Sequence, residues 1–217
     1  MLGLSIPQMI AVSILPLLFA IVIHEVAHGW VAKQLGDPTA KMLGRLTLNP
    51  IKHIDPIGTI LVPLALLVMG GFIFGWAKPV PVTWANLKNP KRDMALVAVA
   101  GPAANLLMAL FWALVAKIGM TLGPDVAWLA TPLALMGIVG VTFNLILMVL
   151  NLLPILPLDG GRIIESLLPG PLSYQFAKLE PYGFILLLVL LVSGLLGNVL
   201  GVPVQFFEQT IFKLFGL

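Results

Sequence analysis

The first 31 residues constrain the chain most, because they are long and apolar enough to cross a bilayer yet carry one charged residue, Glu25. Glu25 belongs to the pentapeptide HEVAH at residues 24–28, which adds two histidines to the same apolar segment. An acidic side chain at the centre of a membrane helix costs roughly 2.5–3.5 kcal/mol on insertion scales, so such residues mark functional sites by default. The segment therefore predicts a membrane helix that carries chemistry.

The composition of the whole chain also indicates a membrane protein. Of its 217 residues 59% are hydrophobic and 10% are charged, whereas a soluble domain has about 25% charged residues. A net charge of +3 does not imply nucleic acid as a partner. Because cysteine is absent, any metal must be held by His, Asp or Glu.

Apolar segments separated by polar, Gly-rich and Pro-rich loops predict an all-α polytopic membrane protein, with residues 1–217 forming a single membrane-embedded domain. We expect about four full transmembrane helices, at residues 7–33, 94–116, 132–153 and 182–200. The first of them is expected to be retained rather than cleaved as a signal peptide, since no basic residue precedes it. A short amphipathic helix at 161–168 and an interfacial amphipathic helix at 204–217 complete the expected elements.

The spacing of the two histidines predicts a metal site. Residues i and i+4 project from one face of a helix, so His24 and His28 can bind the same ion. Glu25 lies beside the first ligand and can reach a water bound to that ion. In zinc hydrolases the metal lowers the pKa of this water and a glutamate accepts its proton. The alternatives are three costly unpaired groups or a proton relay, and we favour the metal site.

Two histidines leave a catalytic zinc one ligand short, because such sites hold three protein ligands and a water. Asp159 follows a membrane helix and precedes two glycines that let the backbone approach closely. From the spacing alone, Asp159 fits a third metal ligand and the N-cap of the 161–168 helix equally well.

Three separated motifs resemble the signature stretches of the site-2 protease family of intramembrane zinc metalloproteases. They are His24-Glu25-x-x-His28, Gly101-Pro102-x-x-Asn105 and Asn151-x-x-Pro154-x-x-x-x-Asp159-Gly160, in the order and approximate spacing of that family. The similarity runs from about residue 15 to 168, and it is to the minimal forms, which have no PDZ or CBS domain. Regulation by such modules is therefore not expected within this polypeptide.

The resemblance implies a ligand set and a mechanism. His24, His28 and Asp159 would bind one Zn²⁺ per chain, and Glu25 would activate the zinc-bound water. Asn151 would position substrate or stabilise the oxyanion, for which a side-chain amide donor is typically worth about 2.7–4 kcal/mol.

Five further residues of the membrane helices receive structural interpretations. Asn105 and Asn144 are expected to form interhelical hydrogen bonds, which average roughly 0.6 kcal/mol in lipid. Gly101, Ala103 and Ala104 are expected to permit close helix packing.

The expected metal site constrains how the helices cross the membrane. If His28 and Asp159 bind one ion, the first helix and the 132–153 helix must run in the same direction. An odd number of crossings must then separate them, and the 94–116 helix supplies one. We therefore expect residues 57–74, which are interrupted by proline and glycine, to be re-entrant and to return to the side they left.

This topology places most of the basic residues on one side of the membrane. Of the twelve Lys and Arg, all but Lys117 and Lys213 fall on one side, which the positive-inside rule assigns to the cytoplasm. We expect a multi-pass integral membrane protein, in the cell membrane if the source is prokaryotic, with its active site nearer the cytoplasmic side.

Two loop segments each have a functional and a structural interpretation. Residues 75–82, with two alternating prolines, are expected to form an edge strand or one arm of a small β-hairpin, which would bind unwound substrate by strand addition; the alternative is an ordinary basic loop. His53 and Asp55 fit a second metal site or a gate, but Asp55-Pro56 also suits the start of a helix, which we favour.

The sequence thus predicts regulated intramembrane proteolysis of a transmembrane protein substrate within the lipid bilayer, with room for a separate regulatory protein and no prediction of oligomeric state. A transporter would need polar residues at several depths along a path, whereas here they gather at one level. A catalytically dead relative acting as an adaptor would usually lack Glu25 or a ligand, and this chain keeps all four.

Overall fold

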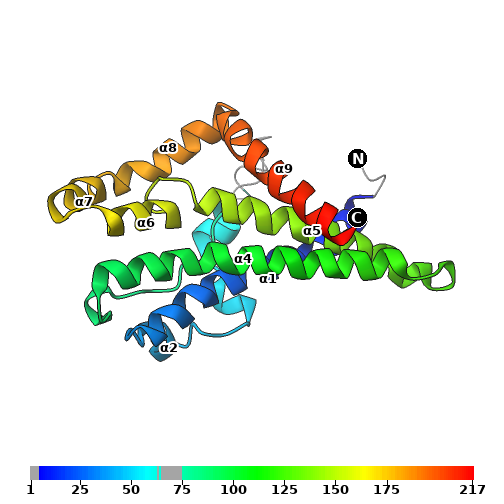
Figure 1. The fold of residues 1–217 in the computed structure, drawn as a ribbon, viewed down its shortest axis with the longest axis horizontal. Helices are drawn as coiled ribbons and strands as arrows, with labels where there is room; N and C mark the ends of the chain where they lie inside the picture. The colour runs from blue at the N-terminus through cyan, green and yellow to red at the C-terminus, as the bar shows by residue number, and fades with distance from the viewer. Residues whose placement is uncertain (1–4, 63, 65–74) are drawn as a thin grey trace.

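The structure, a computed structural model, describes residues 5–62, 64 and 75–217, and it is built from helices (Figure 1). The long helices are α1 (Ile6–Gln34), α4 (Pro90–Thr121), α5 (Ala127–Asn151) and α9 (Leu195–Phe215). The shorter ones are α2 (Thr39–Met42), α6 (Asp159–Leu167), α7 (Gly170–Ala177), α8 (Glu180–Val192), and the single turns η1 (Pro50–His53), η2 (Pro56–Leu61), η3 (Trp84–Asn86) and η4 (Pro124–Val126).

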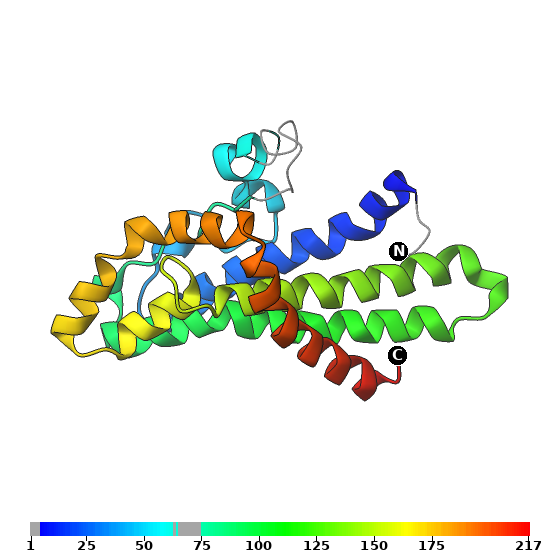
Figure 2. The ribbon, with the colours of Figure 1, turned by 90° about the horizontal axis from the view of Figure 1, so that it is seen from above.

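Helices α1, α4 and α5 pack against one another and run along the long axis of the molecule (Figures 1 and 2). The short connection through η4 makes α4 and α5 antiparallel, and α1 runs in the same direction as α5. The predicted common direction of the first helix and the 132–153 helix is therefore confirmed. As a result, the C-terminal ends of α1 and α5 point toward the same end of the bundle.

Small residues bring α4 and α5 into backbone contact. A Cβ atom on Gly137 would lie 2.3 Å from the backbone nitrogen of Ala116, and one on Gly119 would lie 2.4 Å from that of Ala134. Helices in lipid gain no hydrophobic drive from meeting each other, so close van der Waals packing at small residues is what holds them.

The long connection between α1 and α4 leaves and returns at the same end of the bundle. The backbone N–H of Lys88, just before α4, donates to the carbonyl of Leu35, just after α1, at 3.1 Å. Most of the predicted re-entrant segment, 57–74, lies outside the described residues. Its described flanks meet, because the N–H of Trp76 donates to the carbonyl of Gly58 at 3.0 Å.

The small β-hairpin expected at residues 75–82 is wrong, since none of the described residues lies in a β-strand. The segment has no ladder partner among the described residues, and Pro79 and Pro81 remove two of the N–H groups that a ladder would need. It is held instead by isolated hydrogen bonds: the Arg45 guanidinium donates to the carbonyl of Lys78 at 2.7 Å, and the N–H of Lys78 donates to the carbonyl of His53 at 2.9 Å.

Three helical stretches are long and apolar enough to cross a membrane, namely Pro7–Gln34, Pro90–Thr121 and Pro124–Asn151, and a fourth arises if α7 and α8, bent by 55°, count as one span. The chain is therefore a multi-pass membrane protein with three or four such helices among the residues described.

The expected last span, 182–200, is not one helix. Gly194 adopts a left-handed φ of 76° and ends α8, and the predicted interfacial helix at 204–217 is the second half of α9. At about 1.5 Å per residue, the 13 residues of α8 reach only about 20 Å, less than the hydrocarbon thickness of about 30 Å.

Asp37 joins the end of α1 to the chain that precedes α4. Its buried carboxylate accepts hydrogen bonds from the backbone N–H groups of Thr39 and Thr83 and from the Asn86 amide. Burial raises the pKa of this carboxyl. The hydrogen bonds from Asn86, Thr39 and Thr83 together lower the pKa by more than burial raises it, so the net shift is downward.

We predict that Asp37→Asn lowers the free energy of unfolding by roughly 1.5–3 kcal/mol at pH 7, because the Thr83 N–H loses its charged acceptor. Since the folded-state pKa is the lower one, this stabilisation is present above about pH 3.9, the value in an unfolded chain, and is lost as the pH falls through the folded-state pKa. Thermal unfolding of parent and variant from pH 7 downward should show the difference shrinking. The exposed Asp125→Asn is the control, and equal melting temperatures for all three proteins at pH 7 would contradict the assignment.

Candidate metal centre

Two imidazoles one turn apart on α1 form the first half of the site. His24 and His28 are both buried, and their Nε2 atoms lie 3.0 Å apart. The i, i+4 spacing alone accounts for this geometry, because it stacks both rings on the face of α1 that meets α4.

Asp159 supplies the third side chain. Its carboxylate oxygens lie 3.3 Å from Nε2 of His24 and 3.3 Å from Nε2 of His28. Asp159 is the first residue of α6, and the N-cap position is occupied by Leu158. The alternative interpretation of Asp159 as an N-cap is therefore wrong.

The loop before α6 is wound tightly enough to require glycine. A Cβ atom on Gly160 would lie 2.3 Å from the carbonyl oxygen of Leu152, and one on Gly161 would lie 2.5 Å from the backbone nitrogen of Leu156. The two glycines let α6 start against the end of α5, which places Asp159 over the histidines.

The outer nitrogens of both rings are already engaged. Nδ1 of His24 lies 2.6 Å from Oδ1 of Asn105, and Nδ1 of His28 lies 2.7 Å from the carbonyl oxygen of Val97. These acceptors call for a proton on Nδ1, which leaves each Nε2 with a lone pair directed at Asp159.

The donor set fits a metal ion. One atom each from His24, His28 and Asp159 lies within 4.8 Å of the others, and Asp159 Oδ2 is buried with no hydrogen-bond partner. Burial raises the pKa of the Asp159 carboxyl, but the two imidazoles lower the pKa by more than burial raises it. The net shift favours the ionised form, which binds cations. Two histidines and one carboxylate are a common ligand set of catalytic zinc.

Gly101 of α4 faces the rings directly. A Cβ atom there would lie 2.4 Å from Nε2 of His28 and 2.5 Å from Cε1 of His24. Gly101 therefore makes room for the ligands, beyond the helix packing expected from the sequence. The i, i+4 spacing of Gly101 and Asn105, which puts both on one face of α4, was the signal that could have revealed this.

Glu25 is partly buried beside His24, and its Oε2 accepts a hydrogen bond from the backbone N–H of Val80 at 2.7 Å. The extended segment 75–82 thus lies against the acidic side chain of the motif. This contact could not be predicted from the sequence.

The remaining candidate residues lie apart from the cluster. Asn151 is the last residue of α5, and its amide donates to the carbonyl of Leu147 at 2.9 Å. Among the described residues no hydrogen bond links Asn151 to the histidines or Asp159. Asp55 accepts from the N–H groups of Ile57 and Gly58, which confirms it as a helix N-cap.

His53 lies in the same connection as Asp55. It is buried, with Nε2 2.9 Å from the carbonyl of Thr47. Across the described parts of the chain, the group formed by His24, His28 and Asp159 is the one whose geometry suits a metal, so a second metal site at His53 and Asp55 has no support.

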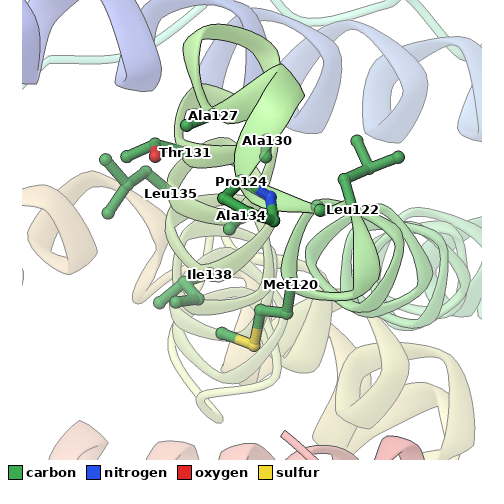
Figure 3. Close-up of a pocket in the computed structure, with 11 residues that line it drawn as sticks. Met120, Leu122, Pro124, Ala127, Ala130, Thr131, Ala134, Leu135 and Ile138 are labelled. Atoms are coloured by element: carbon green, nitrogen blue, oxygen red, sulfur yellow. The ribbon is translucent and has the colours of Figure 1, made fainter.

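A cavity of about 360 Å³ lies at the turn between α4 and α5 (Figure 3). Its lining is apolar apart from Thr131 and includes Gly119, Pro124, Ala130, Ala134 and Ile138. It contains no titratable side chain and sits at the opposite end of the bundle from the C-terminus of α1, so it is not part of the candidate site.

Two buried histidines, a partly buried aspartate and an adjacent glutamate, inside a bundle of apolar helices, define a metallopeptidase-like centre in a membrane protein. Residues 12–123 match the family model described as Peptidase family M50. The chain belongs to this family, the site-2 protease family, and the resemblance seen in the three motifs is confirmed.

Curated relatives agree. The chain is 42% identical over 203 residues to "Putative zinc metalloprotease YwhC" of Bacillus subtilis (strain 168), covering 93% of this chain and 90% of that protein. It is 32% identical over 185 residues to "Putative zinc metalloprotease Rip2" of Mycolicibacterium smegmatis, covering 83% of this chain and 66% of that protein. No solved structure gives a significant match.

We predict that Gly101→Ala removes most of the bound metal while α4 persists. The added methyl group occupies the space of the two imidazoles, whereas alanine is the better helix former by roughly 1 kcal/mol. Zinc content of the purified variant measures the loss, and circular dichroism measures helicity. Ala103→Val, at an exposed position of the same helix, is the control. Parent-level zinc in Gly101→Ala would show that the ligands do not need this space.

Proposed function

We propose that this protein is an intramembrane zinc metalloprotease that hydrolyses a peptide bond in or near the transmembrane segment of another membrane protein. The observation that carries the proposal is the convergence of His24, His28 and Asp159 between apolar helices. Membership of a metalloprotease family supports it independently. Residues 1–217 would act as a single catalytic domain.

One zinc ion per chain would be held by His24, His28 and Asp159, with a fourth position open. Zinc bound there supplies a Lewis acid that makes water acidic and polarises a carbonyl. Nδ1 of His24 is hydrogen-bonded to Asn105, and Nδ1 of His28 is hydrogen-bonded to the backbone carbonyl of Val97. Both ligands are therefore held in place before the metal binds.

Glu25 would act as the general base and then as the general acid. It accepts a proton from the attacking water as the oxygen–carbon bond forms, and it passes that proton to the leaving amine as the carbon–nitrogen bond breaks. Its contact with the N–H of Val80 fixes one carboxylate oxygen and leaves the other for the water.

Asn151 would stabilise the oxyanion or position substrate. Its side chain donates to the carbonyl of Leu147 within α5, so this role requires a rotation toward the substrate. A side-chain donor of this kind is typically worth about 2.7–4 kcal/mol in the transition state.

The substrate would have to be unwound, because a helical peptide hides its carbonyls in its own hydrogen bonds and opening it in lipid is costly. The extended segment 75–82, adjacent to Glu25, is a suitable neighbour for an extended peptide. The lipid bilayer is the second partner, and control would come from a separate regulatory protein.

The site would lie nearer the cytoplasmic side. Apart from Lys117 and Lys213, the basic residues belong to the α1–α4 connection, the ends of α1 and α4 that flank it, α6 and the turn after α7. Helices α2, α6 and α7 lie at one end of the bundle, and the part of the connection around η1 and η2 lies nearer its middle (Figure 1). Lys117 lies at the other end, where its ammonium donates to the carbonyl of Gly216. The positive-inside rule assigns the more basic end to the cytoplasm.

We predict that Glu25→Gln keeps zinc and fold but nearly abolishes cleavage, because an amide cannot accept the proton of water. Cleavage of a reconstituted membrane substrate and zinc content are measured on the same preparation. Asp159→Ala is the contrasting variant and should lose both zinc and activity. Substantial turnover by Glu25→Gln at full zinc occupancy would rule out its role as the base.

Topology gives a second prediction, which the absence of native cysteine makes easy to test. Cysteines placed singly at Lys41 and Lys88 should both resist an impermeant thiol reagent in intact cells and both react after permeabilisation. Gly123→Cys, in the open turn between α4 and α5, should react in intact cells and serves as the control. Labelling of Lys41→Cys but not Lys88→Cys, or the reverse, would show that 57–74 crosses the membrane completely.

A further inference from the structure

We propose that Asn105 and Asn144 form an asparagine bridge that holds His24 in the one tautomer able to bind metal. The inference rests on the zinc site proposed above and adds two positioning residues to it. Neither asparagine supplies an atom to the His24–His28–Asp159 cluster. They would act on His24 through its Nδ1 atom, which faces away from the cluster.

The bridge connects three helices through hydrogen bonds. Oδ1 of Asn105 on α4 lies 2.6 Å from Nδ1 of His24 on α1. The amide nitrogen of Asn105 donates to the carbonyl of Ala20 at 3.1 Å and to Oδ1 of Asn144 on α5 at 3.0 Å. The amide nitrogen of Asn144 donates to the carbonyl of Gly140 at 2.8 Å. Both asparagines have no solvent-exposed surface.

The direction of these hydrogen bonds is fixed at both ends by the backbone. A carbonyl oxygen can only accept, so the NH₂ groups must face Ala20 and Gly140. Rotating Asn144 by 180° would set its oxygen against the carbonyl of Gly140. Rotating Asn105 would set its oxygen against the carbonyl of Ala20 and against Oδ1 of Asn144. Each amide therefore has one orientation without a contact between two acceptors.

This orientation determines the state of the ligand. With Oδ1 of Asn105 as its neighbour, His24 must carry its proton on Nδ1, which leaves the Nε2 lone pair for a metal. If Asn105 were reversed, its NH₂ would require an unprotonated Nδ1, and the proton would move to Nε2, where it blocks the metal. Asn144 thus influences the metal site indirectly, by fixing the orientation of the Asn105 amide.

A neutral amide suits this position better than a carboxylate. Metal-bound histidines usually donate to a carboxylate, a backbone carbonyl or water. His28 uses the carbonyl of Val97. A carboxylate in place of the Asn105 amide would be the third beside His24, after Asp159 and Glu25, and would add an uncompensated negative charge between apolar helices, which is costly in a membrane. Asn105 provides the acceptor without the charge.

The test is zinc affinity, measured by competition with a chromogenic chelator on purified full-length protein. We expect Asn105→Leu to weaken zinc binding by about 10- to 100-fold, and Asn144→Leu to weaken it by about tenfold, the range found for outer hydrogen-bond partners of metal ligands. Thr142→Val, on the same helix as Asn144 but bonded to Glu208, is the control and should retain the parent affinity.

A double variant separates positioning from general damage. If Asn144 acts through Asn105, Asn144→Leu should cause no further loss of zinc affinity when Asn105 is already leucine. Losses that multiply in the double variant would contradict the bridge. Should Asn105→Leu fail to fold, Asn144→Leu decides alone, because Asn144 does not touch His24; an affinity within about threefold of the parent would overturn the proposal, being well below the expected tenfold loss.

The outcomes also separate this inference from the function on which it rests. If the parent binds zinc and the asparagine variants bind it equally well, the bridge is wrong and the proposed protease stands. If the parent binds no zinc and His24→Ala changes nothing, the metal centre itself is wrong, and the bridge falls with it.

Discussion

The structure depends on bringing two imidazoles and a carboxylate together where water is scarce. Each of these groups is costly between apolar helices, and the cost is offset when a cation joins them and when their outer atoms find hydrogen-bond partners. The rest of the bundle meets these two requirements. The common direction of α1 and α5 brings Asp159 to the histidines, Gly101 leaves room for their rings, and Asn105 and the backbone of Val97 satisfy the outer nitrogens.

Much of this site could be predicted from the sequence, because two of its metal-binding side chains are four residues apart on one helix. The i, i+4 relation of His24 and His28 fixes their common face on any helix. Asp159 could not be assigned from spacing alone, since the same residue suits an N-cap. The requirement that two ligands lie at one depth in the membrane was more informative, as it predicted correctly that α1 and α5 run in the same direction.

The predictions that failed depend on contacts between distant parts of the chain or on a single backbone conformation. Alternating prolines at 79 and 81 indicate an extended backbone, but they cannot tell whether a partner strand exists. Here isolated hydrogen bonds, from the Arg45 side chain and to the carbonyl of His53, hold the segment instead. The last span was predicted as continuous because hydropathy does not reveal backbone conformation. The left-handed conformation of Gly194 ends the helix there. Similarly, neither asparagine of the bridge has a local signal that names His24 as its eventual neighbour, 81 residues away from Asn105.

The most direct test of a zinc-dependent protease in the membrane is cleavage of a reconstituted transmembrane substrate by metal-free protein to which single metals are returned. We expect chelation to stop cleavage and about one equivalent of zinc per chain to restore it. Magnesium should not restore it, because two imidazoles and one carboxylate suit zinc and offer magnesium too few oxygens. Undiminished cleavage by protein shown to be free of zinc would rule out a zinc-dependent protease.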